Sequence, residues 1–226
     1  MSVSHLLVLR AVRMRGRDVL TALCCAVFLA GPTAPLTGAA AGGDGGRAAQ
    51  NAYFARWGVV PRELWEGTVR ASATPLTALF VHGGWVHLLG NLLFLHVFGG
   101  LVEERLGRAR FVLFYLVTGY LALLGYAAVH AGSGRALVGA SGAVSGVLGA
   151  FLYLFPRARV TSLLPFLLFL PLRFPAWVVL VFWFVLQWLA AGHDPAGPGV
   201  AHLAHLVGFG LGFLYAWARH RRRGAG

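Results

Sequence analysis

The sequence predicts an all-α polytopic membrane protein, and its composition and segment lengths carry that prediction. Of the 226 residues, 58% are hydrophobic and the mean hydropathy is +0.71, more than a soluble core of this length requires. A transmembrane helix needs about 20 mostly apolar residues. Six segments meet that length, at 19–38, 83–102, 111–130, 137–155, 174–192 and 200–218. We therefore expect a bundle of six transmembrane helices.

Two segments leave alternatives open. The first span, 19–38, follows a cluster of arginines and runs into the small-residue stretch TGAAAGG, which is also typical of a cleaved signal peptide. We expect an uncleaved span, with the signal peptide as the alternative. The apolar run 162–172 is interrupted by Pro165 and Pro171 and is short for a crossing. We expect an interfacial approach to the fifth span there, with a seventh span as the alternative.

The placement of arginine predicts the orientation, because positively charged loops stay in the cytoplasm. With the N-terminus inside, thirteen arginines fall on the inner side and five in the outer loops. Both termini are therefore expected in the cytoplasm. This gives a basic cytoplasmic segment at 1–18, a membrane domain at 19–218 with an outer loop at 41–81, and a basic cytoplasmic tail at 219–226.

The formal net charge of +12 raises the question of nucleic acid binding. All 19 basic residues are arginines, and they lie between apolar runs rather than in one patch. Arginines so placed contact anionic lipid head groups and fix topology. We expect membrane lipids as partners and no nucleic acid. Cys24 and Cys25 are adjacent, so they predict no disulfide framework.

Strongly polar side chains inside a span are costly and are functional candidates by default. They are His87, Asn91 and His96 in the second span, Ser141 and Ser145 in the fourth, and His202 and His205 in the sixth. A helical rise of about 1.5 Å per residue puts His87, Ser141 and His205 roughly 6–7 Å below the outer edge. A hydroxyl and an imidazole therefore share a level that water can reach.

Each of these features alone has a simpler structural interpretation. Serines and glycines in a span are typical of helix packing, and a single intramembrane histidine is typically a buried hydrogen-bonding group. We assign that role to His96 and His202, because nothing pairs with them by spacing. The remaining four residues lie at a common depth on three spans, which favours a functional site. They are His87, Asn91, Ser141 and His205.

Glycines at helical spacing line the fourth and sixth predicted spans. They are Gly142, Gly146 and Gly149 in the fourth and Gly208 and Gly212 in the sixth. Such small-xxx-small patterns let helix backbones approach closely. We therefore expect these two spans to meet closely enough for Ser141 and His205 to bond.

A serine hydroxyl becomes a good nucleophile when a base removes its proton, and a neutral imidazole suits that task near pH 7. Ser141 as nucleophile and His205 as base would form such a pair. The spans contain no carboxylate, and the nearest acid, Asp194, sits at the outer end of the fifth span. The sequence therefore favours a dyad without an acid.

The oxyanion of a tetrahedral intermediate needs hydrogen-bond donors. The backbone N–H of Ser141 lies in the first turn of the fourth span, where amides lack partners within the helix and the helix dipole favours negative charge. His87 and the Asn91 amide lie four residues apart on one helix face and could add two side-chain donors.

Other enzyme classes find less support. Several histidines could bind zinc, but HExxH is absent and no carboxylate is available as a base. The GxSxG elbow of soluble hydrolases is not met, because position 143 is Ala143. We expect no metal and no cofactor.

Taken together, the motifs resemble the rhomboid family of intramembrane serine proteases, in its bacterial type with six transmembrane helices. In chain order they are HGGWVHLLGN at 82–91, GASG at 139–142 and AHLVGFGLG at 204–212, within a similar region from Trp57 to about Trp217. The resemblance implies an integral, multi-pass protein of a bacterial plasma (inner) membrane. It also implies cleavage of transmembrane protein substrates near the outer boundary of the bilayer.

The family pattern implies a role for each matching residue. Ser141 would be the nucleophile and His205 the base, as the AHxxG context selects His205 rather than His202. The remaining roles are the oxyanion donors His87, Asn91 and the Ser141 amide, and the supporting residues Gly139, Gly142, His82 and Gly208.

The sequence departs from the family pattern at two places. Ser145 stands where some members carry a tyrosine against the catalytic imidazole, so the His205 ring must be held otherwise. Arg56 and Trp57 stand in the reverse order of a Trp-Arg pair in some members. A non-catalytic binder of transmembrane clients is the main alternative function, and a transporter with a histidine proton relay is a weaker one.

Overall fold

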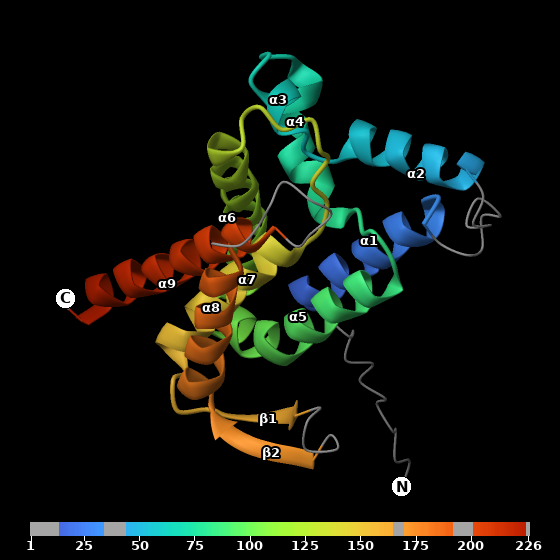
Figure 1. The fold of residues 1–226 in the computed structure, drawn as a ribbon. Helices are drawn as coiled ribbons and strands as arrows, with labels where there is room; N and C mark the ends of the chain where they lie inside the picture. Colours follow the sequence, from blue (N-terminus) through green and yellow to red (C-terminus); the bar gives the residue numbers. More distant parts are fainter. Residues whose placement is uncertain (1–13, 34–43, 165–169, 192–200, 225–226) are drawn as a thin grey trace, which may run out of the picture.

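The computed structural model describes residues 14–33, 44–164, 170–191 and 201–224, and most of these residues are helical (Figure 1). The helices are α1 (Gly16–Ala30), α2 (Asp44–Trp57), α3 (Pro61–Leu64), α4 (Val69–Thr77), the 3₁₀ helix η2 (Ala78–Phe80), α5 (Trp85–Leu106), α6 (Arg108–Val129), α7 (Ser141–Leu154), α8 (Ala176–Ala191) and α9 (His202–Gly224). Two strands, β1 (Arg159–Leu164) and β2 (Leu170–Pro175), separate α7 from α8.

Each of the six predicted spans falls on one helix: α1, α5, α6, α7, α8 and α9. By length and composition, α5 and α6 are the two helices in the described part of the chain that could cross a membrane. Helices α7 and α8 are apolar but shorter. The helical segments are thus confirmed, whereas the count of six crossings and the orientation stay predictions.

Helix α7 lies at the centre of the bundle and contacts α5, α6, α8 and α9. Ten of its fourteen residues are buried. Its small residues make this possible, and α9 crosses it at glycine pairs. A Cβ at Gly208 would collide with the carbonyl oxygen of Gly142, and one at Gly212 with that of Gly146. The predicted close contact between the fourth and sixth spans is therefore confirmed.

The loop predicted at 41–81 is largely helical, and it holds the segment that leads into α7. Val59 and Leu137 form an isolated antiparallel bridge, with N···O distances of 2.9 and 2.8 Å. The N–H of Gly139 donates to the carbonyl of Ala78 at 2.8 Å. These bonds satisfy the backbone of a non-helical segment, so α7 begins at Ser141 rather than at 137.

The apolar run 162–172 contributes to a β-hairpin, drawn below α8 in Figure 1, and its interfacial position stays a prediction. Strands β1 and β2 pair antiparallel, with Val160 opposite Phe174 and Leu163 opposite Pro171. The β-branched Val160 and Thr161 favour extended backbone, and a two-stranded sheet has only edges, where proline is tolerated. Residues 165–169 lie outside the described part. The alternative of a seventh helical span is wrong, because strands occupy both ends of this run, and β1 and β2 are the two strands among the described residues.

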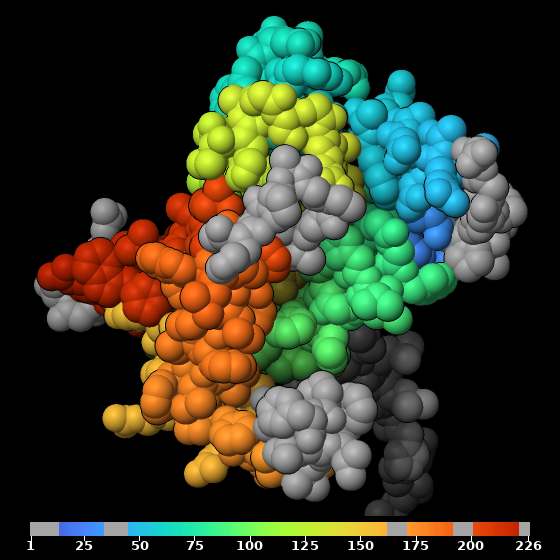
Figure 2. Space-filling model, viewed as in Figure 1, coloured from blue at the N-terminus to red at the C-terminus, as the bar shows by residue number. Residues whose placement is uncertain are grey.

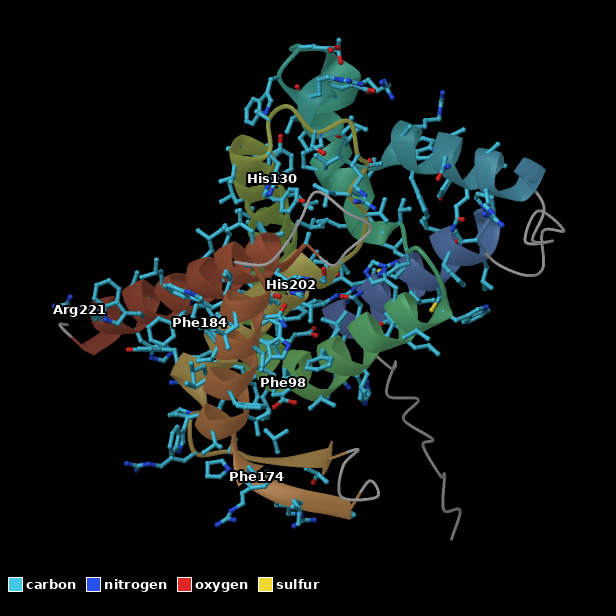
Figure 3. The ribbon with its side chains drawn as sticks, viewed as in Figure 1. Phe98, His130, Phe174, Phe184, His202 and Arg221 are labelled. Carbon is cyan, nitrogen blue, oxygen red and sulfur yellow. The ribbon has the colours of Figure 1, made fainter. Side chains whose placement is uncertain are left out.

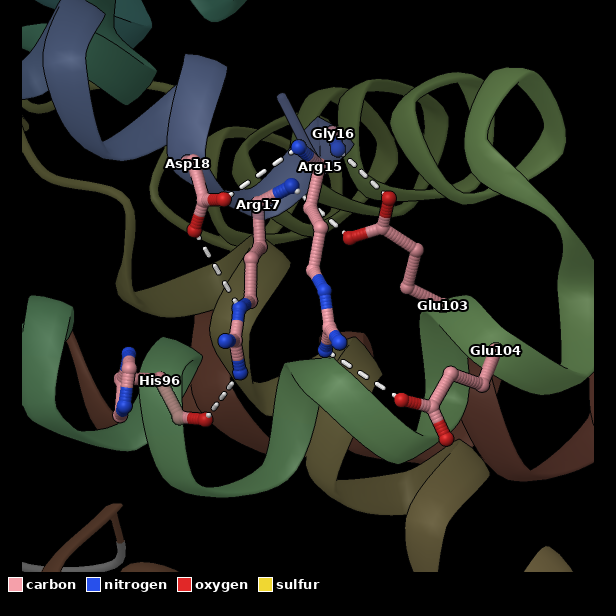
Figure 4. Close-up of polar contacts among 7 residues, drawn as sticks. All are labelled: Arg15, Gly16, Arg17, Asp18, His96, Glu103 and Glu104. Atoms are coloured by element: carbon pink, nitrogen blue, oxygen red, sulfur yellow. Dashed lines mark hydrogen bonds and ion pairs between the residues drawn. The ribbon is translucent and has the colours of Figure 1, made fainter. Parts of the chain in front are cut away.

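Helix α1 is tied to α5 by a buried carboxylate (Figure 4). Glu103 accepts hydrogen bonds from the backbone N–H groups of Gly16 and Arg17, the latter at 3.0 Å. These amides begin α1 and have no partner within the helix. An exposed ion pair between Arg15 and Glu104 lies beside them at 3.3 Å. Further along, α1 buries Leu20, Cys24 and Phe28.

Candidate active site

A pocket of about 760 Å³ opens where α5, α7 and α9 begin. His87, Ser141 and His205 all line it, together with residues 136–138 of the segment before α7. Three residues predicted from separate spans are therefore brought together in one cavity. Asn91 is not among the lining residues.

Ser141 occupies the first position of α7, where the backbone turns from the extended segment into the helix. The N-cap residue Ala140 has no side-chain hydrogen bond to the first turn. The amides of that turn lack carbonyl partners within the helix, and the helix dipole makes this end positive. The local backbone therefore offers N–H groups to an anion at the position where the hydroxyl lies.

His205 is 7% exposed, and its two ring nitrogens have different surroundings. Nδ1 lies 2.7 Å from Oε1 of Gln187 on α8. Nε2 is buried and, among the described residues, has no hydrogen-bond partner. The ring stacks on Trp183, with ring centroids 6.0 Å apart and an angle of 28° between planes. Gln187 of α8 thus bonds Nδ1, whereas Nε2 is available as a hydrogen-bond acceptor on a ring that lines the pocket.

His87 lies in the N-terminal turn of α5, and its ring approaches the segment before α7 at Gly139. The backbone N–H of Gly83 donates to Nδ1 at 3.3 Å, so the ring carries its proton on Nε2 and can donate from there. A Cβ at Gly139 would lie 2.6 Å from Cε1 and Nε2 of this ring. Gly139 also has a φ of +125°, a conformation that favours glycine.

Asn91 is buried one turn after His87 on α5. Its Nδ2 donates to the carbonyl of His87 at 2.8 Å. The expected four-residue spacing is therefore present, but in this structure the amide bonds its own helix rather than facing the cavity.

His82 supports His87 from the preceding loop. It is 1% exposed, its Nδ1 donates to the carbonyl of Phe80 at 3.1 Å, and its ring meets that of His87 edge-on with centroids 5.2 Å apart. Burial, with His87 nearby, lowers the pKa of His82 from 6.5 to about 4. The ring is therefore neutral at pH 7.

Ser145 and the two predicted structural histidines have distinct outcomes. The hydroxyl of Ser145 donates to the carbonyl of Ser141 at 2.7 Å. His202, labelled near the start of α9 in Figure 3, bonds Gln187 at 2.9 Å, which confirms a hydrogen-bonding role. His96 is exposed, so the prediction that it is buried is wrong. Its backbone carbonyl accepts a hydrogen bond from the Arg17 side chain at 3.0 Å (Figure 4).

Gln187 was missed by the sequence analysis, although a signal for it was present. It is the one strongly polar side chain in the predicted span 174–192, and such a residue is a functional candidate by position alone. Asp194, the acid that follows this span in the sequence, lies outside the described residues.

Comparison with known proteins places these observations in a family. The family model for the Rhomboid domain matches residues 64–222, which include every residue of the pocket. The chain is 36% identical over 155 residues to the mitochondrial Rhomboid protein 1 of Saccharomyces cerevisiae, covering 66% of this chain and 42% of that protein.

Bacterial relatives match over shorter stretches. The Rhomboid protease GluP of Bacillus subtilis is 42% identical over 78 residues, covering 34% of this chain and 15% of that protein. The putative rhomboid protease YdcA of the same species is 35% identical over 79 residues, covering 35% of this chain and 39% of that protein.

The chain spans about two-fifths of the length of the mitochondrial and plant relatives that match it over most of its own length. Because those relatives come from mitochondria and plants, the comparisons do not support the expected bacterial inner membrane. The Rhomboid domain and the apolar helices do support a multi-pass integral membrane protein. Because the family model matches residues 64–222, which is most of the chain, this chain belongs to the rhomboid family.

Proposed function

We propose that this protein is an intramembrane serine endopeptidase that hydrolyses a peptide bond in or next to the transmembrane segment of membrane protein substrates. The observation that carries the proposal is one pocket lined by Ser141, His205 and His87. The family includes proteins named as rhomboid proteases, GluP among them. The substrates and partners of this chain are part of the proposal.

In the first step, Oγ of Ser141 attacks the scissile carbonyl carbon while Nε2 of His205 accepts the hydroxyl proton. The lack of a partner on Nε2 among the described residues supports this assignment, because that nitrogen is available as an acceptor. No hydrogen bond joins Ser141 and His205 among the described contacts. Catalytic hydrogen bonds are often long before substrate binds.

The tetrahedral intermediate carries its negative charge near the start of α7. The N–H of Ser141 and Nε2–H of His87 are the proposed donors, and the positive end of α7 adds to the stabilisation. The Nδ2 of Asn91 has a second N–H besides the one bonded to the His87 carbonyl. We keep Asn91 as a proposed donor on that basis.

In the second step, the imidazolium of His205 gives its proton to the leaving amine, and the C–N bond breaks to leave an ester on Ser141. Water, deprotonated by the same ring, then hydrolyses the ester and returns the serine. A transmembrane helix ties up its own carbonyls, so we expect substrates to carry small or helix-breaking residues at the cleaved bond.

The proposal includes the predicted topology: six crossings, both termini in the cytoplasm, and a membrane domain at 19–218 between basic segments at 1–18 and 219–226. The packing of α1 against α5 supports a retained first span, since cleavage after it would remove the groups that bond Glu103. The intact mass of the purified protein tests this, and loss of α1 would favour the signal peptide.

Labelling by a fluorophosphonate in detergent tests the proposed chemistry. Wild-type protein should be tagged, whereas Ser141→Ala and His205→Ala should not. Gly210→Ala is the matched control, because a Cβ there would meet no atom within 4 Å beyond the backbone of its own helix. Equal tagging of Ser141→Ala would contradict the proposal. A well-folded wild type that is never tagged, yet retains transmembrane peptides, would favour the non-catalytic client binder.

A further inference from the structure

Helix α8 contributes a polar side chain to the interior of the bundle beside the proposed site. Figure 2 shows α8 as a ridge on the surface, and its outward side chains are large and apolar, among them Trp177, Phe182 and Trp188. Gln187 is half-buried on the opposite side, toward α9. A lone amide on an apolar helix is costly to bury unless it is hydrogen-bonded. Gln187 forms its hydrogen bonds with two histidines of α9.

The bond to His205 fixes which ring nitrogen holds the proton. The side-chain carbonyl of Gln187 can only accept, so Nδ1 of His205, at 2.7 Å, donates to it. A neutral imidazole with its proton on Nδ1 keeps the lone pair on Nε2. That is the tautomer a base needs, and the His205 ring lines the same pocket as Ser141.

From this geometry we infer that Gln187 is a positioning residue that holds His205 in the Nδ1–H tautomer and orients its ring toward Ser141. The inference rests on the proposed function and deepens it, because it supplies the group that orients the base in a dyad without an acid. In serine hydrolases with a triad, a carboxylate performs that task.

An amide suits this position better than a carboxylate. A carboxylate at this half-buried position would lose part of its hydration, which costs free energy beside an apolar bundle. The amide carbonyl accepts the same hydrogen bond without a net charge. It also accepts from Nδ1 of His202 at 2.9 Å, which places two donors on its two lone pairs.

The same helix face also holds the ring from the side. Trp183 lies four residues before Gln187, so the two side chains stand one turn apart on α8. Trp183 stacks on the His205 ring, while Ser145, the position of a tyrosine in some family members, bonds the backbone of its own helix. The support of the imidazole therefore comes from α8 rather than from α7.

Two measurements on the full-length protein test the inference. The first is ¹⁵N NMR of histidine-labelled protein in detergent, with the His205 signals assigned from their absence in His205→Ala. The second is the rate of fluorophosphonate labelling, together with kcat and KM on a transmembrane peptide. The variants are Gln187→Met, which keeps the length but removes the acceptor, and Gln187→Glu, which keeps an acceptor.

Gln187→Met should shift the proton of His205 toward Nε2 and slow both labelling and kcat by about 10- to 100-fold, the size of loss found when the partner that orients a metal-binding histidine is removed. KM should change little. Gln187→Glu should restore the Nδ1–H tautomer and most of the rate. Leu186→Met is the matched control, because Leu186 is exposed on the outward face of α8.

An Nδ1–H tautomer and a labelling rate that both survive Gln187→Met would overturn the inference, as would a slower rate with an unchanged tautomer. The NMR result does not depend on catalysis. A wild type that is never labelled, yet shows the Gln187-dependent tautomer, would therefore refute the protease proposal and leave the hydrogen bond established without a catalytic role.

Discussion

A methyl group at Gly139 would lie 2.6 Å from two atoms of the His87 imidazole. Gly139, two residues before the proposed nucleophile, is thus in direct contact with the proposed oxyanion donor on α5. The backbone of the segment before α7 therefore packs against the His87 side chain of α5 and sets the position of that ring.

Gly139→Ala should displace His87 and strain the backbone, because φ is +125° there. Removing one oxyanion donor typically costs about 10²- to 10³-fold in rate, so we expect a loss of that size in fluorophosphonate labelling. Gly132→Ala is the control, since a Cβ there meets nothing within 4 Å. Equal rates in the two variants would contradict the contact.

Gly212→Ala should destabilise the fold, because the new Cβ would collide with the carbonyl oxygen of Gly146. Overpacking of this kind costs about 1–3 kcal/mol, and a collision with backbone is hard to relieve. Thermal unfolding followed by tryptophan fluorescence in detergent measures the effect. Gly210→Ala, two residues earlier and in open space, should melt close to wild type, and similar melting of both variants would argue against the α7–α9 contact.

Glu103→Ala should loosen α1, because two amides at its start would lose their acceptor. Leaving such groups unsatisfied costs about 1–3 kcal/mol. Glu104→Ala removes only an exposed ion pair with Arg15, which is worth about 0–1 kcal/mol. Proteolysis rates near residue 30 and melting temperatures should separate the two variants, and a Glu104 variant that is the more damaged would refute this account.

The buried His82 should make stability depend on pH. Its folded pKa of about 4 lies below the unfolded value of 6.5, so the unfolded chain binds a proton that the folded protein excludes. The contribution of the neutral His82 ring to the free energy of unfolding is complete above about pH 6.5 and is lost as the pH falls toward 4. Melting temperatures between pH 7.5 and 4 should fall less steeply for His82→Gln than for wild type. Parallel curves would show that His82 does not contribute.

The sequence by itself determined the six long apolar helical segments and the candidate residues. Long apolar runs need no tertiary information, because segment length and hydropathy report directly on helices that face lipid or a core. The spacing of Gly208 and Gly212 likewise predicted the close approach of α9 to α7. Ser141, His205 and His87 could be selected because polar groups in apolar segments are costly and therefore informative.

The tertiary structure decided the surroundings of each selected side chain. The hairpin at 159–175 depends on cross-strand pairing, which a proline-interrupted apolar run does not reveal. The amide of Asn91 bonds its own helix, His96 is exposed, and His205 is held by Gln187 rather than by a neighbour in sequence. These outcomes depend on how helices rotate and pack against one another, and local periodicity carries no information about which distant residue meets a given ring nitrogen.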